Sequence, residues 1–388
     1  MSCPLSEPLL GGNADAYVRD ALASTFVANG PYVARFEDEV AARVGAPFAV
    51  ACASGTAAIH LALHALGIGP GDEVWVSDLT FVASANPARY CGARVTLVDS
   101  ERESWNLAPD VVVGELTRRA RRGVAMPAAI VAVHLLGHPA HLGPVLEAAA
   151  RHGVPVVEDA AEALGATWTA GAGPALDGRE VGTVGTVGCY SFNGNKIMTT
   201  GGGGMVVTHD ATLAARVRHL ATQAKEPGVG YVHDEIGFNY RMSNLAAALG
   251  VAQLEQLDAF LARRRAIADR YDAAFADVDG IKAAPDCAWA RRSGWLSSIV
   301  LEDEVTRERV RLALDGAGIE SRPVWPPLRT QAPYRDAPVL GGNVAVELGE
   351  RVLNLPSSAS LGDEQQERVI DVVRHALWSH STPALRVS

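Results

Sequence analysis

Short apolar runs alternate along this chain with stretches in which apolar residues recur at helical spacing. The runs predict buried strands at 48–53, 73–77, 94–98, 128–134 and 154–158. The stretches between them predict helices at 57–66, 111–121 and 142–152,. Because strands alternate with helices, the pattern predicts an α/β fold with a mostly parallel central sheet covered on both faces.

The pattern of helices and strands changes in the second half of the chain. A long helical pattern runs from 245 to about 271, and the composition changes near 277–280. A strand at 296–301 and helices at 307–317 and 364–378 follow. A chain of 388 residues also exceeds what one small core usually organises,. We therefore expect a large domain at 1–250 and a smaller C-terminal α/β domain at 251–388.

Composition narrows the class of protein. The net charge of -10 and the pI near 5.6 argue against nucleic acid or an anionic membrane as a partner,. No apolar run is long enough for a membrane span, and the first residues lack the pattern of a signal peptide,. The five cysteines are scattered and odd in number, which favours buried thiols in a reducing cytoplasm,.

A single lysine stands in a glycine-rich turn between two apolar strands. Lysine is rare in this chain, occurring at Lys196, Lys225 and Lys282, although Lys and Arg together total 34. Arginine cannot lose its proton near neutral pH, whereas a neutral lysine amine can attack a carbonyl. Lys196 follows Tyr190 and Phe192 and precedes a run of glycines, a setting unlike that of a solvated surface lysine. We therefore interpret Lys196 as a Schiff-base lysine.

A candidate phosphate site lies near the start of the chain. The strand at 48–53 leads through Ser54, Gly55 and Thr56 directly into the helix at 57–66. The N-terminus of a helix presents free amide N–H groups and a positive dipole, which together bind anions. An ordinary helix cap would give the same pattern. The glycines at 67–71 follow a helix instead of a strand, so they do not form a dinucleotide-binding turn,.

A third candidate group is the carboxylate at the end of the strand at 154–158. Glu158 and Asp159 stand where that strand ends, and ligands of parallel sheets bind outside the carboxyl ends of strands,. One carboxylate could bind a metal, act as a base, cap the next helix or hold a protonated ring nitrogen. With a lysine and a phosphate site on the same edge, the combination describes pyridoxal phosphate.

Histidines offer the alternative of a metal site. His60 and His64 are four residues apart, and His134, His138 and His141 lie in one predicted loop. Zinc would need further converging ligands, and the chain contains neither an HExxH motif nor a paired Cys/His pattern,. We therefore expect no metal, with the first two histidines on a partly buried helix face.

Four motifs in order carry a resemblance to a known family: SGTAA at 54–58, TFVASAN at 80–86, EDAAEALG at 158–165 and GFNYRMSN at 237–244. With them, the chain resembles the DegT/DnrJ/EryC1/StrS family of pyridoxal phosphate-dependent nucleotide-sugar aminotransferases, which have the fold-type I architecture. The motifs NGNK at 193–196 and TTGGGG at 199–204 are most similar to the branch that aminates C4 of UDP-4-keto-6-deoxy-N-acetylhexosamines.

The resemblance implies a role for each matching residue. Lys196 would carry the coenzyme and transfer protons, and Asp159 would pair with the pyridine nitrogen. Glu162 would lie near the ring hydroxyl, where many relatives have Gln or His, and Phe81 would stack on the ring. Further contacts to the coenzyme phosphate would come from Gly55, Thr56 and Ser191, and from Asn239 of the neighbouring subunit in a homodimer with shared active sites.

The resemblance also implies the substrates. L-glutamate would donate the amino group to a UDP-linked keto sugar, with a dTDP- or GDP-linked sugar as the alternative. We expect substrate contacts from Asn29, Asn195, Arg322 and Arg329, the last standing where relatives often have His. A related sugar dehydratase would replace the lysine, usually by His. A non-catalytic binding homologue would be expected to have lost Lys196 or Asp159, and both are present.

Overall fold

The structure is a computed structural model that describes residues 3–228 and 230–378. An eight-stranded sheet has the order β1-β8-β7-β5-β4-β2-β3-β13, and β8 alone runs against the other strands. The predicted mostly parallel sheet is therefore confirmed. Its strands are β1 Phe48–Cys52, β2 Glu73–Ser77, β3 Arg94–Val98, β4 Ala129–Val133, β5 Val156–Asp159, β7 Val187–Ser191, β8 Gly204–Thr208 and β13 Val339–Leu340.

Helices cover both faces of this sheet because its strands are apolar on both sides. Trp75 packs into one core with residues of α2, α5, α6 and α8, whereas its neighbours Val74 and Val76 pack into a second core with α3, α4 and α7. Successive side chains of a strand point to opposite faces, so both cores need apolar residues. The helices are α1 Ala14–Ala23, α2 Pro31–Val44, α3 Gly55–Ala65, α4 Asn86–Tyr90, α5 Pro109–Arg122, α6 Gly143–Arg151, α7 Ala211–Ala221 and α8 Asn244–Leu254.

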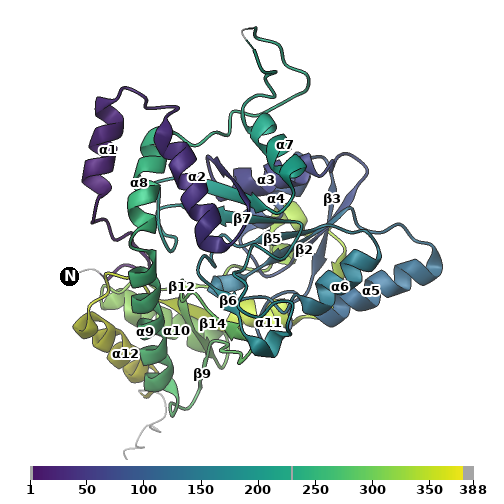
Figure 1. Cartoon of the computed structure of the whole chain (residues 1–388). Helices are drawn as coiled ribbons and strands as arrows, with labels where there is room; N and C mark the ends of the chain where they lie inside the picture. The colour runs from purple at the N-terminus through teal and green to yellow at the C-terminus, as the bar shows by residue number, and fades with distance from the viewer. Residues whose placement is uncertain (1–2, 229, 379–388) are drawn as a thin grey trace, which may run out of the picture.

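The C-terminal part builds a second, four-stranded antiparallel sheet with its own core. Figure 1 shows this part, with α9, α10 and α12, grouped on one side of the large sheet. Its strands are β9 Ile281–Ala283, β11 Ser297–Leu301, β12 Arg322–Pro323 and β14 Val352–Leu355, and its helices are α9 Leu257–Phe275, α10 Glu304–Gly316, α11 Val344–Arg351 and α12 Asp363–Trp378. The division at 250/251 stays a prediction, and β13 from the C-terminal part joins the edge of the large sheet.

The helix predicted from 245 to about 271 is wrong in one respect. It is two helices, α8 and α9, bent by 62° where α8 ends at Leu254 and α9 begins at Leu257. Tyr17 on α1 and Asn13 just before it donate hydrogen bonds to Glu255 at this break. Among the described residues no single helix is long and apolar enough to cross a membrane, and this bent pair passes only on combined length and composition.

Shorter elements complete the connections. A two-stranded sheet pairs β6 Thr167–Trp168 with β10 Ala290–Arg291. All five cysteines are buried and free, as their scattered positions predicted. The 3-10 helices are η1 Val82–Ser84, η2 Leu135–Gly137, η3 Ala170–Ala172, η4 Leu328–Thr330 and η5 Ala332–Tyr334.

Candidate active site

A cavity of about 410 Å³ lies at the carboxyl ends of β5 and β7, beside the start of α3. Parallel sheets bind their ligands at this edge. The cavity brings together residues that are far apart in the sequence. Nine of the predicted site residues line it: Gly55, Thr56, Phe81, Asp159, Glu162, Ser191, Asn195, Lys196 and Arg322.

Lys196 reaches the cavity from the turn between β7 and β8. Its side chain is 12% exposed, and its Nζ lies 3.6 Å from Oε1 of Glu162. The same Nζ lies 4.0 Å from the centre of the Trp295 ring. The backbone is held as well, since Arg264 donates a 3.5 Å hydrogen bond to the Lys196 carbonyl. The amine is therefore enclosed by protein instead of being free in solvent.

Asp159 ends β5 and directs its carboxylate into the cavity. Its Oδ2 accepts a 2.6 Å hydrogen bond from the Ser84 hydroxyl, and its Oδ1 accepts a 3.1 Å bond from the Ala161 amide. Glu158 lies outside this cavity and accepts hydrogen bonds from the amides of Gly182 and Val184. The prediction that one carboxylate of this pair faces the cavity is confirmed.

The first turn of α3 forms the floor on which an anion could sit. Ser54 caps the helix by accepting a 3.1 Å hydrogen bond from the Ala57 amide. Gly55 leaves no room for a side chain, because a Cβ there would lie 2.7 Å from the Ser191 Cβ. Gly204 is equally restricted, since its Cβ would meet the Ser54 carbonyl oxygen at 2.4 Å. The chain thus keeps bare backbone at the helix terminus, where anions bind.

Glu162 is the buried acid of the site. One oxygen, Oε2, accepts a 2.8 Å hydrogen bond from the Leu136 amide, and the other faces Lys196. Burial raises the pKa of this carboxyl to about 7, although Lys196 acts in the opposite direction. A carboxyl that can gain or lose a proton near neutral pH is typical of a functional site.

Three predicted residues do not line this cavity. Asn29 is exposed beside a separate cavity of about 270 Å³, and Asn239 is exposed on the surface. Arg329 forms ion pairs with Asp78 at 2.5 Å and Asp99 at 3.3 Å. The guanidinium also donates to the Gly342 carbonyl. In the chain without ligand, Arg329 thus joins the residues that follow β2 and β3 to the C-terminal part, and its predicted contact with a substrate stays a prediction.

Other residues of the cavity escaped the sequence analysis. Ser84, Trp295 and Trp325 all line it. The two indole rings stack with centres 6.0 Å apart, and the half-exposed Phe81 ring lies 6.1 Å from Trp325. Both tryptophans come from the C-terminal part, and nothing in their local sequence signals a site. Ser84 could have been found only by its place within the TFVASAN motif.

A second cavity, larger at about 660 Å³, lies at the opposite edge of the sheet. We call it the strand-start cavity, because Glu73 and Arg94, the first residues of β2 and β3, line it. Its half-buried acid, Glu73, is already neutralised, since Arg119 pairs with it at 2.5 Å and Thr96 donates to the same carboxylate at 2.6 Å. Volume alone would have selected the wrong edge of the sheet.

The histidines considered as metal ligands have other partners. The Nδ1 of His134 accepts from the Ala140 amide, so in a neutral ring its Nε2 carries the proton that bonds Glu158 at 3.0 Å,. Burial lowers the pKa of His60 and of His138 to about 4. His60 lies in a buried position on α3 and His64 in a half-buried one, as predicted.

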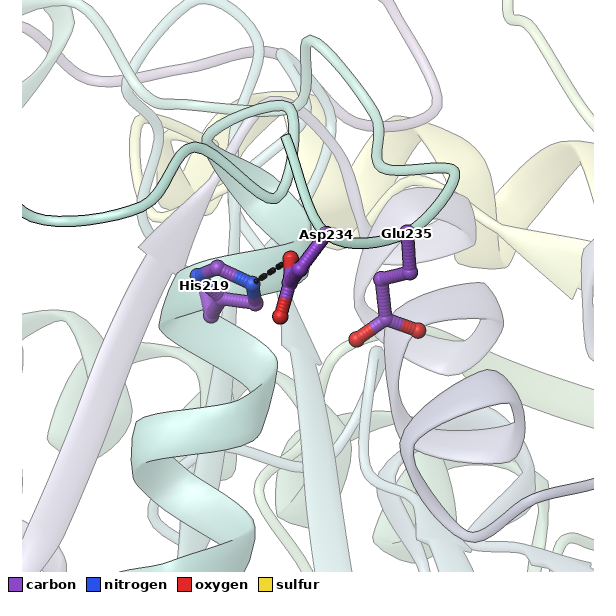
Figure 2. Close-up of side chains that lie close together, drawn as sticks. All are labelled: His219, Asp234 and Glu235. Atoms are coloured by element: carbon purple, nitrogen blue, oxygen red, sulfur yellow. Dashed lines mark hydrogen bonds and ion pairs between the residues drawn. The ribbon is translucent and has the colours of Figure 1, made fainter. Parts of the chain in front are cut away.

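Among the described residues, one other group gathers ligand atoms of the kind that metals use. Figure 2 shows His219, Asp234 and Glu235, with a 2.7 Å hydrogen bond from the His219 ring to Asp234. Both oxygens of Glu235 accept hydrogen bonds from Arg216, at 2.9 and 3.1 Å. Because the carboxylates are already paired, this group is better explained as a surface ion-pair network than as a metal site.

The residues of the smaller cavity fit pyridoxal phosphate. The coenzyme needs an amine, an acidic partner for its ring nitrogen and a site for its phosphate. Lys196, Asp159 and the first turn of α3 provide one of each around the same space. The close packing at Gly55 and Gly204 preserves the bare backbone that a phosphate requires,. The fold and this site together define an aminotransferase that uses pyridoxal phosphate.

Comparison with known proteins identifies the family. Residues 8–374 match the model of the DegT/DnrJ/EryC1/StrS aminotransferase family, and the chain belongs to that family. It is 40% identical to a Bacillus subtilis (strain 168) protein whose provisional name is pyridoxal phosphate-dependent aminotransferase EpsN, over 96% of this chain and 95% of the relative.

Two further similarities extend over nearly the whole length. The chain is 39% identical to the GDP-perosamine synthase of Caulobacter vibrioides (strain ATCC 19089 / CIP 103742 / CB 15), covering 96% of this chain and 98% of the relative. The crystal structure of the aminotransferase TlmJ from Streptoalloteichus hindustanus superposes with a TM-score of 0.88 at 30% identity, covering 98% and 100% of the two chains. The predicted fold-type I architecture, cofactor and enzyme class are therefore confirmed.

Proposed function

We propose that this aminotransferase moves the amino group of L-glutamate to the keto carbon of a nucleotide-linked 4-keto-6-deoxy sugar. The observation that carries the proposal is the convergence of Lys196 and Asp159 on the first turn of α3 in one cavity. The names of the relatives support a sugar as the acceptor. The products are 2-oxoglutarate and an amino sugar that keeps its nucleotide.

Two nucleotides, GDP and UDP, are the main candidates for the group linked to the keto sugar. The motif at 193–204 supports the UDP-linked N-acetylhexosamine expected from the sequence, whereas two relatives at 39% identity are named GDP-perosamine synthase. Those relatives match over more than nine tenths of this chain, while the motif covers a single turn. We therefore rank a GDP-linked keto sugar first and a UDP-linked one second, with a dTDP-linked sugar as the third candidate.

The residues of the site divide the chemistry among them. When bound, pyridoxal phosphate supplies an aldehyde that accepts the amino group and a ring that withdraws electrons from the substrate. The Nζ of Lys196 is the group that removes and returns substrate protons. Asp159, fixed by Ser84 and Ala161, holds a negative charge towards the cavity. The first turn of α3 supplies amide donors for phosphate oxygens.

A cationic group is needed for the nucleotide diphosphate, because the protein carries a net charge of -10. Arg322 lines both the active-site cavity and an adjoining cavity of about 240 Å³. Its side chain is 70% exposed and pairs with Glu320 at 2.6 Å. An exposed pair of this kind exchanges partners at little cost, so Arg322 is free to turn to a substrate phosphate.

We also propose a homodimer in a reducing cytoplasm, in which Asn239 completes the phosphate site of the neighbouring subunit. Asn239 is exposed and absent from the cavity of its own chain. The region around α1 also leaves Leu22 and Phe26 more than half exposed, as expected of an interface,. The five free, buried thiols suit a reducing compartment,.

Mixing two inactive variants tests the shared site. If Lys196→Ala and Asn239→Ala dimers exchange subunits, one site of each mixed dimer is intact, and an equal mixture should regain about a quarter of the wild-type activity. No recovery after confirmed subunit exchange would contradict the shared site. The proposed amino transfer itself would be unaffected by that result.

A substrate panel tests the reaction. Enzyme with pyridoxal phosphate and L-glutamate is incubated with GDP-, UDP- and dTDP-linked 4-keto-6-deoxy sugars, and the amine is scored by mass spectrometry. The expected result is one amino sugar for each 2-oxoglutarate formed, with the GDP-linked sugar used fastest. Amination of none of these sugars, while glutamate still converts the coenzyme, would overturn the choice of acceptor.

A further inference from the structure

Glu162 is held by hydrogen bonds at both its side chain and its backbone. Its Oε2 accepts a 2.8 Å hydrogen bond from the Leu136 amide, and its carbonyl oxygen accepts a 3.1 Å bond from the Ser293 hydroxyl. The side chain is 6% exposed. With one carboxyl oxygen and the backbone both fixed, the remaining oxygen, Oε1, faces Lys196 at 3.6 Å.

The amide that holds Glu162 is presented by an unusual backbone. Leu136 has φ 55° and ψ 17°, a left-handed conformation that residues other than glycine seldom adopt,. The next residue, Gly137, is also left-handed, and its carbonyl accepts a 2.9 Å hydrogen bond from the Ser293 amide. Strained backbone of this kind persists where the surrounding structure enforces it, commonly at functional sites. Here it points an N–H at a buried carboxyl.

We propose that Glu162 is the proton partner of Lys196. After the Lys196 amine takes a proton from the substrate, one N–H bond of the resulting ammonium breaks and an O–H bond forms at Oε1 of Glu162. The electron pair stays on nitrogen, so the lysine is again a neutral base and the glutamate is a neutral acid. The reverse transfer restores both groups when the acceptor is protonated.

The surroundings allow this exchange. A separation of 3.6 Å permits an ion pair but exceeds a hydrogen bond, and contacts between catalytic groups often shorten when substrate binds,. The charged groups facing Glu162 are Lys196, from the turn after β7, and Asp159, from the end of β5, whereas η2 contributes a neutral amide. Burial, partly offset by Lys196, raises the pKa of Glu162 to about 7. The carboxyl can therefore hold or release a proton at working pH.

The proposal rests on amino transfer at Lys196 and not on the identity of the sugar, so the glutamate half-reaction is a sufficient test. Glu162→Gln keeps an oxygen for the Leu136 amide and cannot exchange a proton. We expect the wild-type rate to fall as pH drops below about 7, because a protonated Glu162 can no longer accept a proton. The variant should lose that dependence and be about tenfold slower above pH 7, with little change in the KM for glutamate.

The matched control is Glu180→Gln. Glu180 is also buried, with a pKa raised to about 6 by burial, but it pairs with Arg43 at 2.8 Å and does not line the cavity. This variant should keep the wild-type pH profile. If Glu162→Gln also keeps the wild-type rate and profile, the proposal is overturned.

A second readout does not need turnover. Infrared difference spectra of the coenzyme-free protein, recorded between pH 5 and 9, report the carbonyl stretch of a protonated carboxyl. The wild type should show a band that disappears around pH 7 and is missing in Glu162→Gln but retained in Glu180→Gln. A Glu162 that is ionised throughout this range would contradict the proposal, even if the sugar assignment is correct.

Discussion

The two edges of the large sheet carry cavities whose acids differ in burial and in hydrogen-bond partners. In the strand-start cavity, burial raises the pKa of Glu73, but hydrogen bonds from Arg119, Thr96 and Trp75 together lower it by more. The net pKa is therefore below its ordinary value. In the active-site cavity burial dominates, and Glu162 has a pKa of about 7. The larger cavity, of about 660 Å³ against about 410 Å³, thus contains the acid that is less suited to exchange a proton near neutral pH.

The difference shows what marks a site in this molecule. The carboxylate of Glu73 already accepts hydrogen bonds from neighbouring side chains, so it stabilises the fold and has little left to bind a ligand,. Glu162 and Asp159 are buried and Lys196 is half-buried, and all three line the cavity; burying charged groups is costly unless a ligand or a reaction uses them,.

Lys196→Ala should reduce amino transfer by at least about 10⁴-fold, because it removes both the nucleophile and the proton carrier. Wild-type protein should shift the visible absorption of added pyridoxal phosphate, and Lys196→Ala should not cause this shift. Lys282→Ala, an exposed lysine on β9, is the control and should keep full activity. Near-wild-type turnover in the first variant, with a normal circular dichroism spectrum, would remove the basis for the site.

Asp159→Asn should lower kcat by about 10²–10³-fold, since a neutral amide cannot provide the charge that the protonated ring nitrogen requires. The side chain keeps its size and one oxygen for the Ser84 hydroxyl. Steady-state kinetics and a coenzyme titration measure the effect. A loss smaller than a few-fold would mean that Asp159 is only a cap for the chain that follows β5.

Ser84→Ala should lower kcat by about tenfold, since a hydrogen bond to a charged group contributes about 1.5–3 kcal/mol and the Ala161 amide still holds the carboxylate,. Ser100→Ala is a matched control, because the Ser100 hydroxyl is buried without a hydrogen-bond partner among the described residues. Equal kinetics for the two variants would show that Ser84 does not position Asp159.

Glu162→Gln should change how stability depends on pH. A carboxyl whose folded pKa is about 7 and whose ordinary value is 4.5 binds more protons in the folded state, so wild-type stability falls as pH rises from about 4.5 to 7,. The variant lacks this loss. Between pH 4.5 and 7, the free energy of unfolding of the variant should therefore rise relative to that of the wild type by on the order of 2 kcal/mol. Urea denaturation of the coenzyme-free proteins measures the difference, and parallel curves would contradict the raised pKa.

Glu73→Gln should leave kcat unchanged and lower the free energy of unfolding by about 1–3 kcal/mol, because Arg119 loses a partly buried partner,. The pKa of Glu73 is lowered on balance, so its contribution is present above its ordinary value of 4.5 and is lost as pH falls below that value,. The difference in the free energy of unfolding between wild type and variant should therefore become smaller as pH falls below 4.5. A clear loss of turnover would show that the strand-start cavity takes part in the reaction.

The sequence predicted the parts of this molecule that local pattern determines. The strands of the large sheet other than β13 follow from their apolar runs, and Asp159 stands at the end of one of them. Gly55 follows from the direct passage of a strand into a helix. In each case the signal and the structure lie within a few residues of each other.

Features that depend on distant contacts were not predictable in this way. The apolar pattern continues across Glu255, with no Gly or Pro from Leu254 to Leu257, and the break between α8 and α9 coincides with contacts from the α1 region. Trp295 and Trp325 reach the cavity from the C-terminal part. Arg329 resembled a substrate residue by position, yet Asp78 and Asp99 occupy its guanidinium. Sequence pattern does not report which of two arginines has a buried acid beside it.

The burial of every cysteine gives the protein a built-in reporter of local opening. Cys52, Cys91 and Cys189 lie in the core that the large sheet shares with α3, α4 and α7, whereas Cys3 lies in the core of the four-stranded sheet. A thiol reagent can modify each sulfur only when the surrounding layer separates. Mass spectrometry of the modified peptides over time would then show whether the two sheets open together or one at a time, with no label or substitution added.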